Sequence, residues 1–247
     1  MKAMVFAAGL GTRLRPLTND RPKALVEVGG KTMLERVITH LADCGVTDIT
    51  VNIHLFGEKI IEFLEEKKNF GLDIHISDER DLLLDTGGGL MKARKFLDGD
   101  EPFIVHNADI LTDLDLKAMY DFHVEHDALS TILVKDRQTQ RYFLFDHDHR
   151  LKGWINKKTG ETKPEGYQYD PQKVDSLAFG CVHVLSPRIF DALEKYSKAK
   201  GKVFSIAPFY AEMCDSYKIY GYQQFSDYKW LDVGKPETLA QAEEMFK

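Results

Sequence analysis

Short apolar runs alternate with helical patterns over the first half of the chain, and no other feature restricts its fold as strongly. An apolar run opens the chain at residues 3–8, a helical period follows at 34–41, and alternating residues mark a strand at 49–53. A second round of helix and strand follows at residues 60–64 and 72–76. Repeated strand–helix–strand units predict an α/β fold whose sheet is doubly wound, mostly parallel and Rossmann-like.

The second half of the chain departs from this rhythm in one segment. Residues 137–175 contain short hydrophobic stretches separated by charged and glycine-containing turns, which predicts a small antiparallel insert or lid. Around it, the patterns predict strands at 103–105, 131–134, 179–185 and 230–233, and helices at 116–122, 187–195, 206–214 and from 236 onward. We therefore expect a single domain over residues 1–247, with no C-terminal β-helix domain appended to it.

The charge and the cysteine content exclude several kinds of partner. The 247 residues carry a formal net charge of −6, so no general attraction to nucleic acid or to an anionic membrane is expected. The apolar run at the N-terminus is too short for a signal peptide or a membrane span. The three cysteines are odd in number and include no C-x-x-C pair, which indicates a reducing compartment, most simply the cytoplasm.

The loop that follows the first predicted strand is suited to phosphate binding. Gly9 and Gly11 let backbone N–H groups face outward, and Arg13 and Arg15 add positive charge. A dinucleotide fingerprint is disfavoured because Leu14 stands where its third glycine would be, and a P-loop is disfavoured because no G-K-[ST] follows. We interpret the segment as a triphosphate loop of another kind.

Lys23 lies shortly after this loop, in the sequence Pro22-Lys23-Ala24-Leu25, where the proline fixes the backbone and can aim the ammonium group at the loop. Together, G-x-G-T-R-L-x-P-L-T and P-K-x-L resemble the signature of the sugar-1-phosphate nucleotidyltransferases, a family with a GT-A-like fold. These enzymes join a nucleoside triphosphate to a sugar 1-phosphate and release pyrophosphate. The resemblance covers essentially the whole chain and implies that Arg13 and Lys23 are catalytic. It assigns nucleotide binding to Ala8, Gly9, Leu10, Gly11 and Thr12.

Two aspartates are implied as metal ligands. In the family, two aspartates far apart in the sequence hold a catalytic Mg²⁺ ion, and they map here to Asp109 and Asp232. Asp109 follows a predicted strand at the edge where α/β sheets bind ligands, and Asp232 lies in a short apolar strand before Gly234. Carboxylate oxygens suit a hard cation that bridges phosphates, so Mg²⁺ is the expected cofactor.

The stretch from Asp85 to Gly89 is expected to be a loop before a short helix, in which the glycines let the backbone lie against a flat nucleobase. The resemblance places the base against Thr86 and Gly87, with Glu79 as the acidic residue that precedes them. This T-G-G-G form is most similar to that of the N-acetylmuramate-1-phosphate uridylyltransferases, and guanylyltransferases carry related loops. UTP is therefore the expected donor, and GTP is the alternative.

The sugar side shows two departures from the family pattern. The segment from Gly153 to Lys157 stands in the place of G-x-x-E-K, so Lys157 is implied to bind the sugar phosphate, while Asn156 replaces the glutamate that holds sugar hydroxyls. The same implied site includes Gly180. Ala108 stands where the family has glycine before the metal aspartate. These departures leave the identity of the sugar open.

The expected activity is Mg²⁺-dependent transfer of a nucleoside monophosphate to a sugar 1-phosphate, with N-acetylmuramate 1-phosphate, used for the cell envelope, as the candidate acceptor. The alternatives are a mannose-1-phosphate guanylyltransferase and, in another class, a non-catalytic regulatory subunit that binds nucleotide-sugars. Nucleoside triphosphate and sugar 1-phosphate are the expected partners, with a monomer or small homo-oligomer as the assembly. A redox Rossmann enzyme is disfavoured because no acidic residue ends the second predicted strand.

Overall fold

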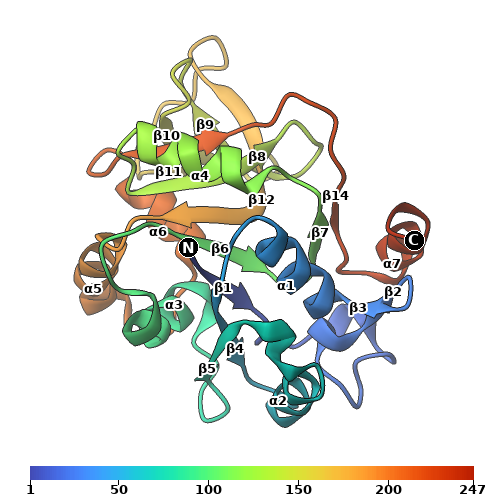
Figure 1. Cartoon of the computed structure of the whole chain (residues 1–247). Helices are drawn as coiled ribbons and strands as arrows, with labels where there is room; N and C mark the ends of the chain where they lie inside the picture. Colours follow the sequence, from blue (N-terminus) through green and yellow to red (C-terminus); the bar gives the residue numbers. More distant parts are fainter.

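Four parallel strands form one end of the main sheet in the computed structural model, which describes residues 1–247 (Figure 1). They are β1 (Lys2–Phe6), β4 (Asp48–Ile53), β5 (Asp73–Asp78) and β6 (Phe103–Asn107), in the spatial order β6-β1-β4-β5. The chain starts at β1, adds β4 and β5 on one side, and then crosses over to add β6 on the other. Such a reversal opens a crevice beyond the carboxyl ends of the strands, where α/β sheets bind their ligands. The predicted α/β class is confirmed.

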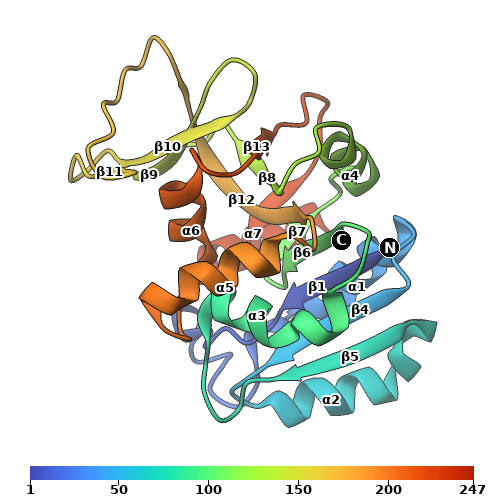
Figure 2. The same ribbon diagram turned by 90° about the vertical axis from the view of Figure 1, so that its left-hand side faces the viewer.

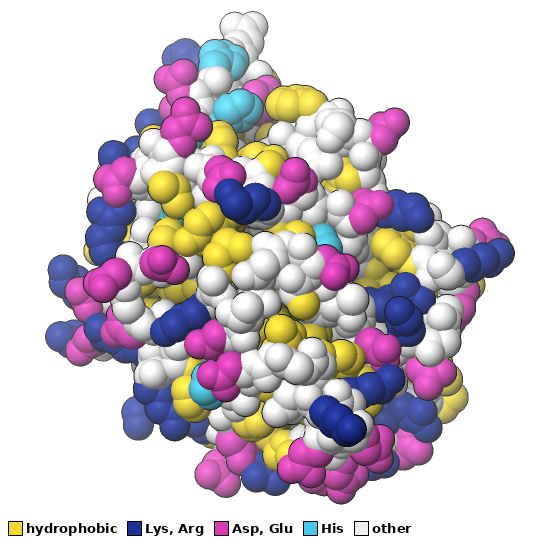
Figure 3. Space-filling model, viewed as in Figure 1, with side chains coloured by type: hydrophobic (Ala, Val, Ile, Leu, Met, Phe, Trp, Pro, Cys, Tyr) yellow, Lys and Arg dark blue, Asp and Glu magenta, His cyan; other side chains and the backbone are white.

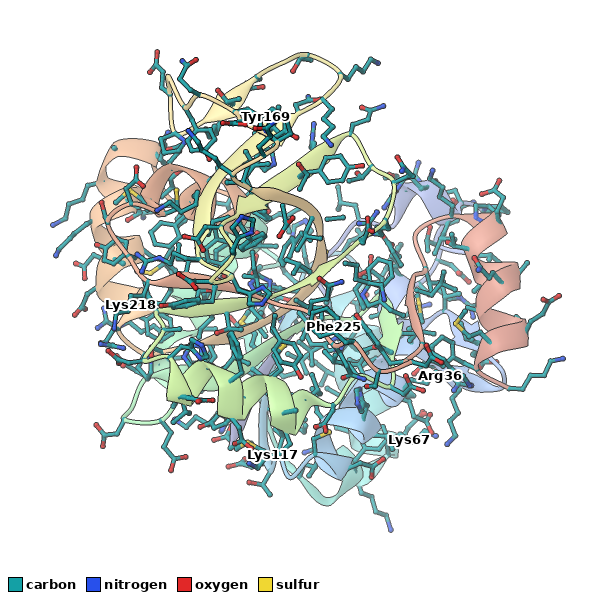
Figure 4. The ribbon with its side chains drawn as sticks, turned by 90° about the horizontal axis from the view of Figure 1, so that it is seen from above. Arg36, Lys67, Lys117, Tyr169, Lys218 and Phe225 are labelled. Atoms are coloured by element: carbon teal, nitrogen blue, oxygen red, sulfur yellow. The ribbon has the colours of Figure 1, made fainter.

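Antiparallel strands extend the sheet beyond β6. The long strand β12 (Asp175–Leu185) pairs with β6, with β8 (Ser130–Lys135) and with β9 (Arg141–Phe145). β10 (Leu151–Asn156) and β11 (Thr162–Lys163) follow β9 in antiparallel pairing, while β13 (Ile219–Tyr222) pairs parallel with β8. Strands β9 to β11 are the predicted antiparallel insert, and Figure 2 shows them at the opposite end of the sheet from β5. Tyr169, on the segment between β11 and β12, and Lys117, on the helix α4, lie on opposite sides of the molecule in the view of Figure 4.

Seven helices cover the two faces of the sheet. They are α1 (Met33–Asp43), α2 (Gly57–Glu66), α3 (Asp85–Leu97), α4 (Leu116–Glu125), α5 (Ile189–Lys200), α6 (Ile206–Met213) and α7 (Pro236–Met245). The alternation of side chains along β1 separates two cores: Ala3 and Val5 face the core that includes α1, α2, α4 and α7, while Met4 faces α3, α5 and α6. None of the helices is long and apolar enough to span a membrane.

Two short ribbons place functional segments beside the main sheet. β7 (Ile110–Thr112) pairs antiparallel with β14 (Trp230–Asp232), and β2 (Glu27–Val28) pairs with β3 (Lys31–Thr32). Short 3₁₀ turns lie at Thr12–Leu14, Lys23–Leu25 and Lys68–Gly71. The β7–β14 ribbon joins segments that are more than a hundred residues apart in the sequence. The proximity of Asp109 to Asp232 therefore depends on the tertiary fold.

Three buried histidines make the stability of the fold depend on pH. Burial lowers the pKa of His106 and His123 to about 4 and that of His183 to about 3, from an ordinary value of 6.5. Below pH 6.5 the unfolded chain therefore takes up protons that the folded chain does not, and stability falls as the pH drops toward 4. Each histidine contributes up to about 1.4 kcal/mol per pH unit to this loss.

We expect the free energy of unfolding, measured by urea denaturation, to decrease between pH 6.5 and pH 4.5. Replacing the exposed His147 with Gln should leave that slope unchanged, because its ring is not buried. Equal stability at pH 7 and pH 5 would contradict the assignment of neutral, buried rings.

Candidate active site

A cavity of about 340 Å³ opens at the carboxyl ends of the four parallel strands. Its size falls within the range of small-molecule sites. The strands place Phe6 to Gly9 after β1, Asn52 in β4, Glu79 after β5, and Asp109 after β6 along its wall. The rest of the wall consists of Lys23, Ala24, Leu83, Asp85, Thr86, Asn107, Ala108 and Val203. Four of the eight residues that the sequence assigned to nucleotide binding thus line the cavity, namely Ala8, Gly9, Glu79 and Thr86.

The loop after β1 presents backbone amides with no partner in the protein. The amides of Ala7 and Ala8 donate to Asn52 Oδ1 at 2.7 and 3.2 Å, and this fixes the start of the loop. The amides of residues 9–13 donate no hydrogen bond within the protein. Gly11 adopts a left-handed conformation at φ 61°, and an added Cβ there would lie 2.9 Å from Lys23 Cβ. The loop therefore packs on Lys23 and leaves a group of donors able to receive an anion.

Lys23, Arg13 and the two predicted aspartates form one charged cluster. Lys23 Nζ forms an ion pair with Asp109 Oδ2, and the two side chains are only 11% and 24% exposed. Asp232 is brought beside them because β14 pairs with β7, and Val233 N donates to the Asp109 carbonyl at 2.9 Å. At Gly234, an added Cβ would lie 2.7 Å from Arg13 Nη2 and 2.9 Å from Asp232 Oδ1. Glycine at this position lets the guanidinium and the carboxylate approach each other.

The electrostatics of this cluster suit a divalent cation. Burial, and next the charge of Asp109, raise the pKa of Asp232, while Lys23, Arg13 and Arg137 oppose the shift. Asp232 Oδ1 is buried and has no hydrogen-bond partner. An orphaned carboxylate oxygen beside a second carboxylate is the donor set that a hard cation takes from a protein. The residues present therefore fit Mg²⁺.

A cysteine also lies near the two carboxylates. Burial, followed by the charges of Asp109 and Asp232, raises the pKa of the Cys181 thiol to about 12. The thiol is neutral at physiological pH, so it is a poor nucleophile. The arrangement favours chemistry that needs no covalent intermediate.

Asn52 and Glu79 form the floor of the cavity. Glu79 is completely buried, and its Oε1 and Oε2 accept from Asn52 Nδ2 at 2.7 Å and from Leu84 N at 3.0 Å. The side chain that the sequence assigned to base recognition is therefore also a structural acceptor. The sequence analysis missed Asn52, because it stands at a polar position of the alternating strand β4 and is not distinguished there from Thr50.

The prediction that Asp85 to Gly89 form a loop is wrong, because these residues are the first turns of α3. The amides of Gly87 and Gly88 donate to the Phe204 carbonyl at 2.9 and 3.2 Å. An added Cβ on Gly87 would lie 2.3 Å from the Phe204 ring, so Gly87 contacts the protein itself and does not line the cavity. Thr86 does line it, and its hydroxyl accepts from Ile206 N at 3.0 Å. The glycines thus serve the close packing of α3 on residues 202–206.

This packing predicts that Gly88→Ala destabilises the protein. An added Cβ would lie 2.2 Å from the Lys202 carbonyl oxygen, which is backbone and cannot rotate away. Overpacking of this kind costs about 1–3 kcal/mol, which should appear as a lower Tm in a thermal melt. Gly9→Ala is the matched control, because a methyl group there meets no atom within 4 Å. An unchanged Tm for Gly88→Ala would show that α3 does not pack closely on the Lys202 carbonyl.

The residues predicted for the sugar phosphate lie in two places. Asn156 ends β10, and its Oδ1 accepts from Lys158 N at 3.0 Å, so it shapes the following turn. Lys157 Nζ lies 4.4 Å from the centre of the Tyr142 ring, and neither residue lines the cavity. Gly180 is different, because its carbonyl accepts from Trp230 Nε1 at 3.0 Å, two residues before Asp232. The structure therefore ties Gly180 to the strand of Asp232, whereas Asn156 contacts the turn that follows it and Lys157 contacts β9.

A second group that could hold a metal ion lies at the opposite edge of the sheet. Asp48 and Asp73 begin β4 and β5, and His75 lies beside them, with His75 Nε2 at 3.5 and 3.6 Å from the two carboxylates. These residues are at the amino ends of the parallel strands, away from the cavity.

The surface carries acidic and basic side chains interspersed over the face drawn in Figure 3.

The chain belongs to the nucleotidyl transferase family, whose model matches residues 2–247. It is 31% identical over 243 residues to "Mannose-1-phosphate guanyltransferase" of Candida albicans, a match that covers 97% of this chain and 62% of that protein. The chain thus spans less than two thirds of the length of that relative.

Two further matches cover both partners almost completely. The chain is 31% identical over 248 residues to "N-acetylmuramate alpha-1-phosphate uridylyltransferase" of Neisseria meningitidis serogroup B, which covers 98% of this chain and 97% of that protein. Its structure is similar to that of HddC from Yersinia pseudotuberculosis complexed with GMP-PN, with a TM-score of 0.77 and 24% identity over 100% of this chain and 99% of that one. This second likeness supports the fold alone.

Proposed function

We propose that this protein is a sugar-1-phosphate nucleotidyltransferase that transfers a uridylyl group from UTP to a sugar 1-phosphate, of which N-acetylmuramate 1-phosphate is the first candidate. The observation that carries the proposal is the cluster of Lys23, Asp109 and Asp232 at the mouth of a cavity lined by the phosphate loop. The near-complete match to the uridylyltransferase relative supports the choice of substrates.

The residues around the cavity have separate tasks in the proposed reaction. A phosphate oxygen of the sugar 1-phosphate attacks the α-phosphorus of the triphosphate, and pyrophosphate leaves in line. The free amides of residues 9–13 and Arg13 would hold the β- and γ-phosphates, and Lys23 would neutralise charge at the reacting phosphate. The protein thus contributes position and charge, which is the main requirement of phosphoryl-type transfer.

Asp109 and Asp232 would hold Mg²⁺, as the orphaned Asp232 Oδ1 indicates. The ion supplies neutralisation of the negative charge on both substrates. Lys23 orients the Asp109 carboxylate through their ion pair, which holds it beside Asp232 as a ligand.

The geometry of Glu79 favours UTP over GTP. Guanine recognition by a carboxylate uses its two oxygens to accept from N1–H and N2–H. Both oxygens of Glu79 already accept hydrogen bonds from the protein, and the side chain is fully buried. The smaller edge of uracil can be read by backbone groups, so it depends less on this carboxylate. GTP stays the alternative because one relative is named as a mannose-1-phosphate guanyltransferase.

A non-catalytic regulatory subunit is the rival of another class. A subunit of this kind could bind nucleotide-sugars on the same fold without needing a complete catalytic cluster. Here Arg13, Lys23, Asp109 and Asp232 are all present and gathered together, which favours catalysis.

The test is a pyrophosphate-release assay of the purified protein with Mg²⁺, across UTP, GTP, CTP, ATP and dTTP and a panel of sugar 1-phosphates. We expect the highest kcat/KM with UTP and N-acetylmuramate 1-phosphate. A clear preference for GTP would replace the uridylyl assignment by a guanylyl one, with mannose 1-phosphate as the acceptor to test first. No release with any pair would favour the regulatory subunit.

A further inference from the structure

Two cations lie at and just after the carboxyl end of β8, on the same side of the sheet as Asp109 after β6. Strands β8 and β6 both pair antiparallel with β12, so they run in the same direction. The carboxyl end of β8, at Lys135, therefore faces the active-site edge, and Arg137 follows two residues later. Neither residue was singled out by the sequence analysis.

Contacts with an aromatic ring and the backbone fix the guanidinium of Arg137. Its Nη2 donates to the Phe179 carbonyl at 3.2 Å, and its Cζ lies 5.1 Å from the centre of the Trp230 ring. The same indole donates to the Gly180 carbonyl at 3.0 Å and lies two residues before Asp232. Arg137 is therefore held against the strand that carries Asp232, with the face of its fork on an aromatic ring.

Neither cation forms an ion pair, although Arg137 lies close enough to Asp232 for the two charges to affect each other. Several arginines elsewhere form ion pairs, as Arg80 does with Asp78 and Arg188 with Asp127, both at 2.6 Å. Lys135 Nζ lies only over aromatic rings, at 3.9 Å from the centre of Tyr228 and 5.6 Å from that of Trp230. Arg137 Nε is buried without a hydrogen-bond partner. Two half-buried like charges placed side by side repel each other, and a bound anion would relieve that cost.

These observations identify a cationic site that Lys157 does not provide. None of Lys157, Lys135 and Arg137 lines the cavity wall, but Lys157 lies over Tyr142 of β9, whereas Arg137 lies beside Trp230 on the strand of Asp232. A guanidinium recognises planar or tetrahedral oxyanions through parallel N–H donors, so a phosphate and a carboxylate are equivalent ligands for it.

We propose that Lys135 and Arg137 bind an oxyanion of the acceptor sugar 1-phosphate, either its phosphate or a carboxylate on the sugar. The proposal rests on the proposed function. Lys135 is the weaker partner of the two, because burial and then the charge of Arg137 lower its pKa.

The test is a kinetic comparison of wild type, Arg137→Gln and Arg137→Lys with saturating triphosphate. The two acceptors are N-acetylglucosamine 1-phosphate, which has no carboxylate, and N-acetylmuramate 1-phosphate, which has one. Loss of a hydrogen bond to a charged group should raise the KM for the acceptor about 10- to 100-fold in Arg137→Gln. The KM for the triphosphate should stay within about twofold, because Arg137 does not touch the loop amides. Arg137→Lys should recover part of the loss, since the charge is kept.

The two acceptors separate the sources of the anion. A rise in KM with both identifies the phosphate, and a rise confined to the N-acetylmuramate compound identifies its carboxylate. Where an acceptor is not turned over, its inhibition constant against the accepted one replaces the KM. Arg188→Gln and Lys218→Gln are the matched controls, because both side chains pair with Asp127 before the amino end of β8 (Lys218 is labelled in Figure 4).

An acceptor KM within twofold of wild type for Arg137→Gln would overturn the proposal. So would equal losses in kcat for both acceptors together with a raised KM for the triphosphate, because that pattern indicates a structural role. An inactive wild type would refute the proposed function instead, so the two failures are distinguishable.

Discussion

Asp232→Asn is expected to lower kcat by about 10²-fold or more while the protein stays folded. The substitution preserves the size of a side chain whose Oδ1 is buried without a partner, and it removes the charge that a metal ion requires. Burial and the charge of Asp109 already disfavour the ionised form of Asp232, so the neutral amide should leave stability equal or slightly higher. Asp109→Asn should lose activity to a similar extent.

The measurement is pyrophosphate release at saturating substrates, alongside a thermal melt of each variant. Asp100→Asn, an exposed carboxylate in the turn before β6, serves as the control and should behave as wild type. Rates within about threefold of wild type for either active-site variant would refute the metal assignment.

Lys23→Ala is expected to lower kcat/KM by about 10²–10³-fold, because water cannot replace a fixed charge at the reacting phosphate. It should also destabilise the protein, since Asp109 loses the partner of a mostly buried ion pair. The double variant Lys23→Ala/Asp109→Asn separates the two effects. It should recover much of the stability, because no unpaired charge is left, and none of the activity.

Kinetics and urea denaturation of the two variants give both readouts. If Lys23→Ala leaves kcat/KM unchanged, Lys23 has no part in catalysis. If the double variant is no more stable than the single one, the unpaired charge of Asp109 is not what destabilises Lys23→Ala.

The periodicity of the sequence predicted the parallel half of the fold well. The apolar run that became β1 and the helical spacing of Leu34, Val37 and Ile38 in α1 are local signals, and the order of elements follows from them. The direction of β12 is not a local property. Its alternating residues are compatible with either direction, and only its pairing with β6, β8 and β9 makes it antiparallel.

The candidate site was predictable where one segment carries the chemistry and unpredictable where distant segments meet. The loop from Gly9 to Arg13 and the Pro22-Lys23 turn could be interpreted from their own residues. The function of Gly87 and Gly88 could not be interpreted in this way, because these glycines pack against Phe204 and Lys202, more than a hundred residues later in the sequence. The position of the Arg137 guanidinium likewise depends on its contact with the Trp230 ring, which a local sequence pattern does not reveal.

Asn52 mechanically links the two ends of the proposed nucleotide pocket. Its Oδ1 accepts from the two amides that begin the phosphate loop, while its Nδ2 donates to Glu79, at the end where we propose that the nucleobase binds. A base that displaces Glu79 would therefore pull on the loop that positions the triphosphate. We expect discrimination between bases to appear largely in kcat, as a slower chemical step. A triphosphate with the wrong base should therefore bind but react slowly.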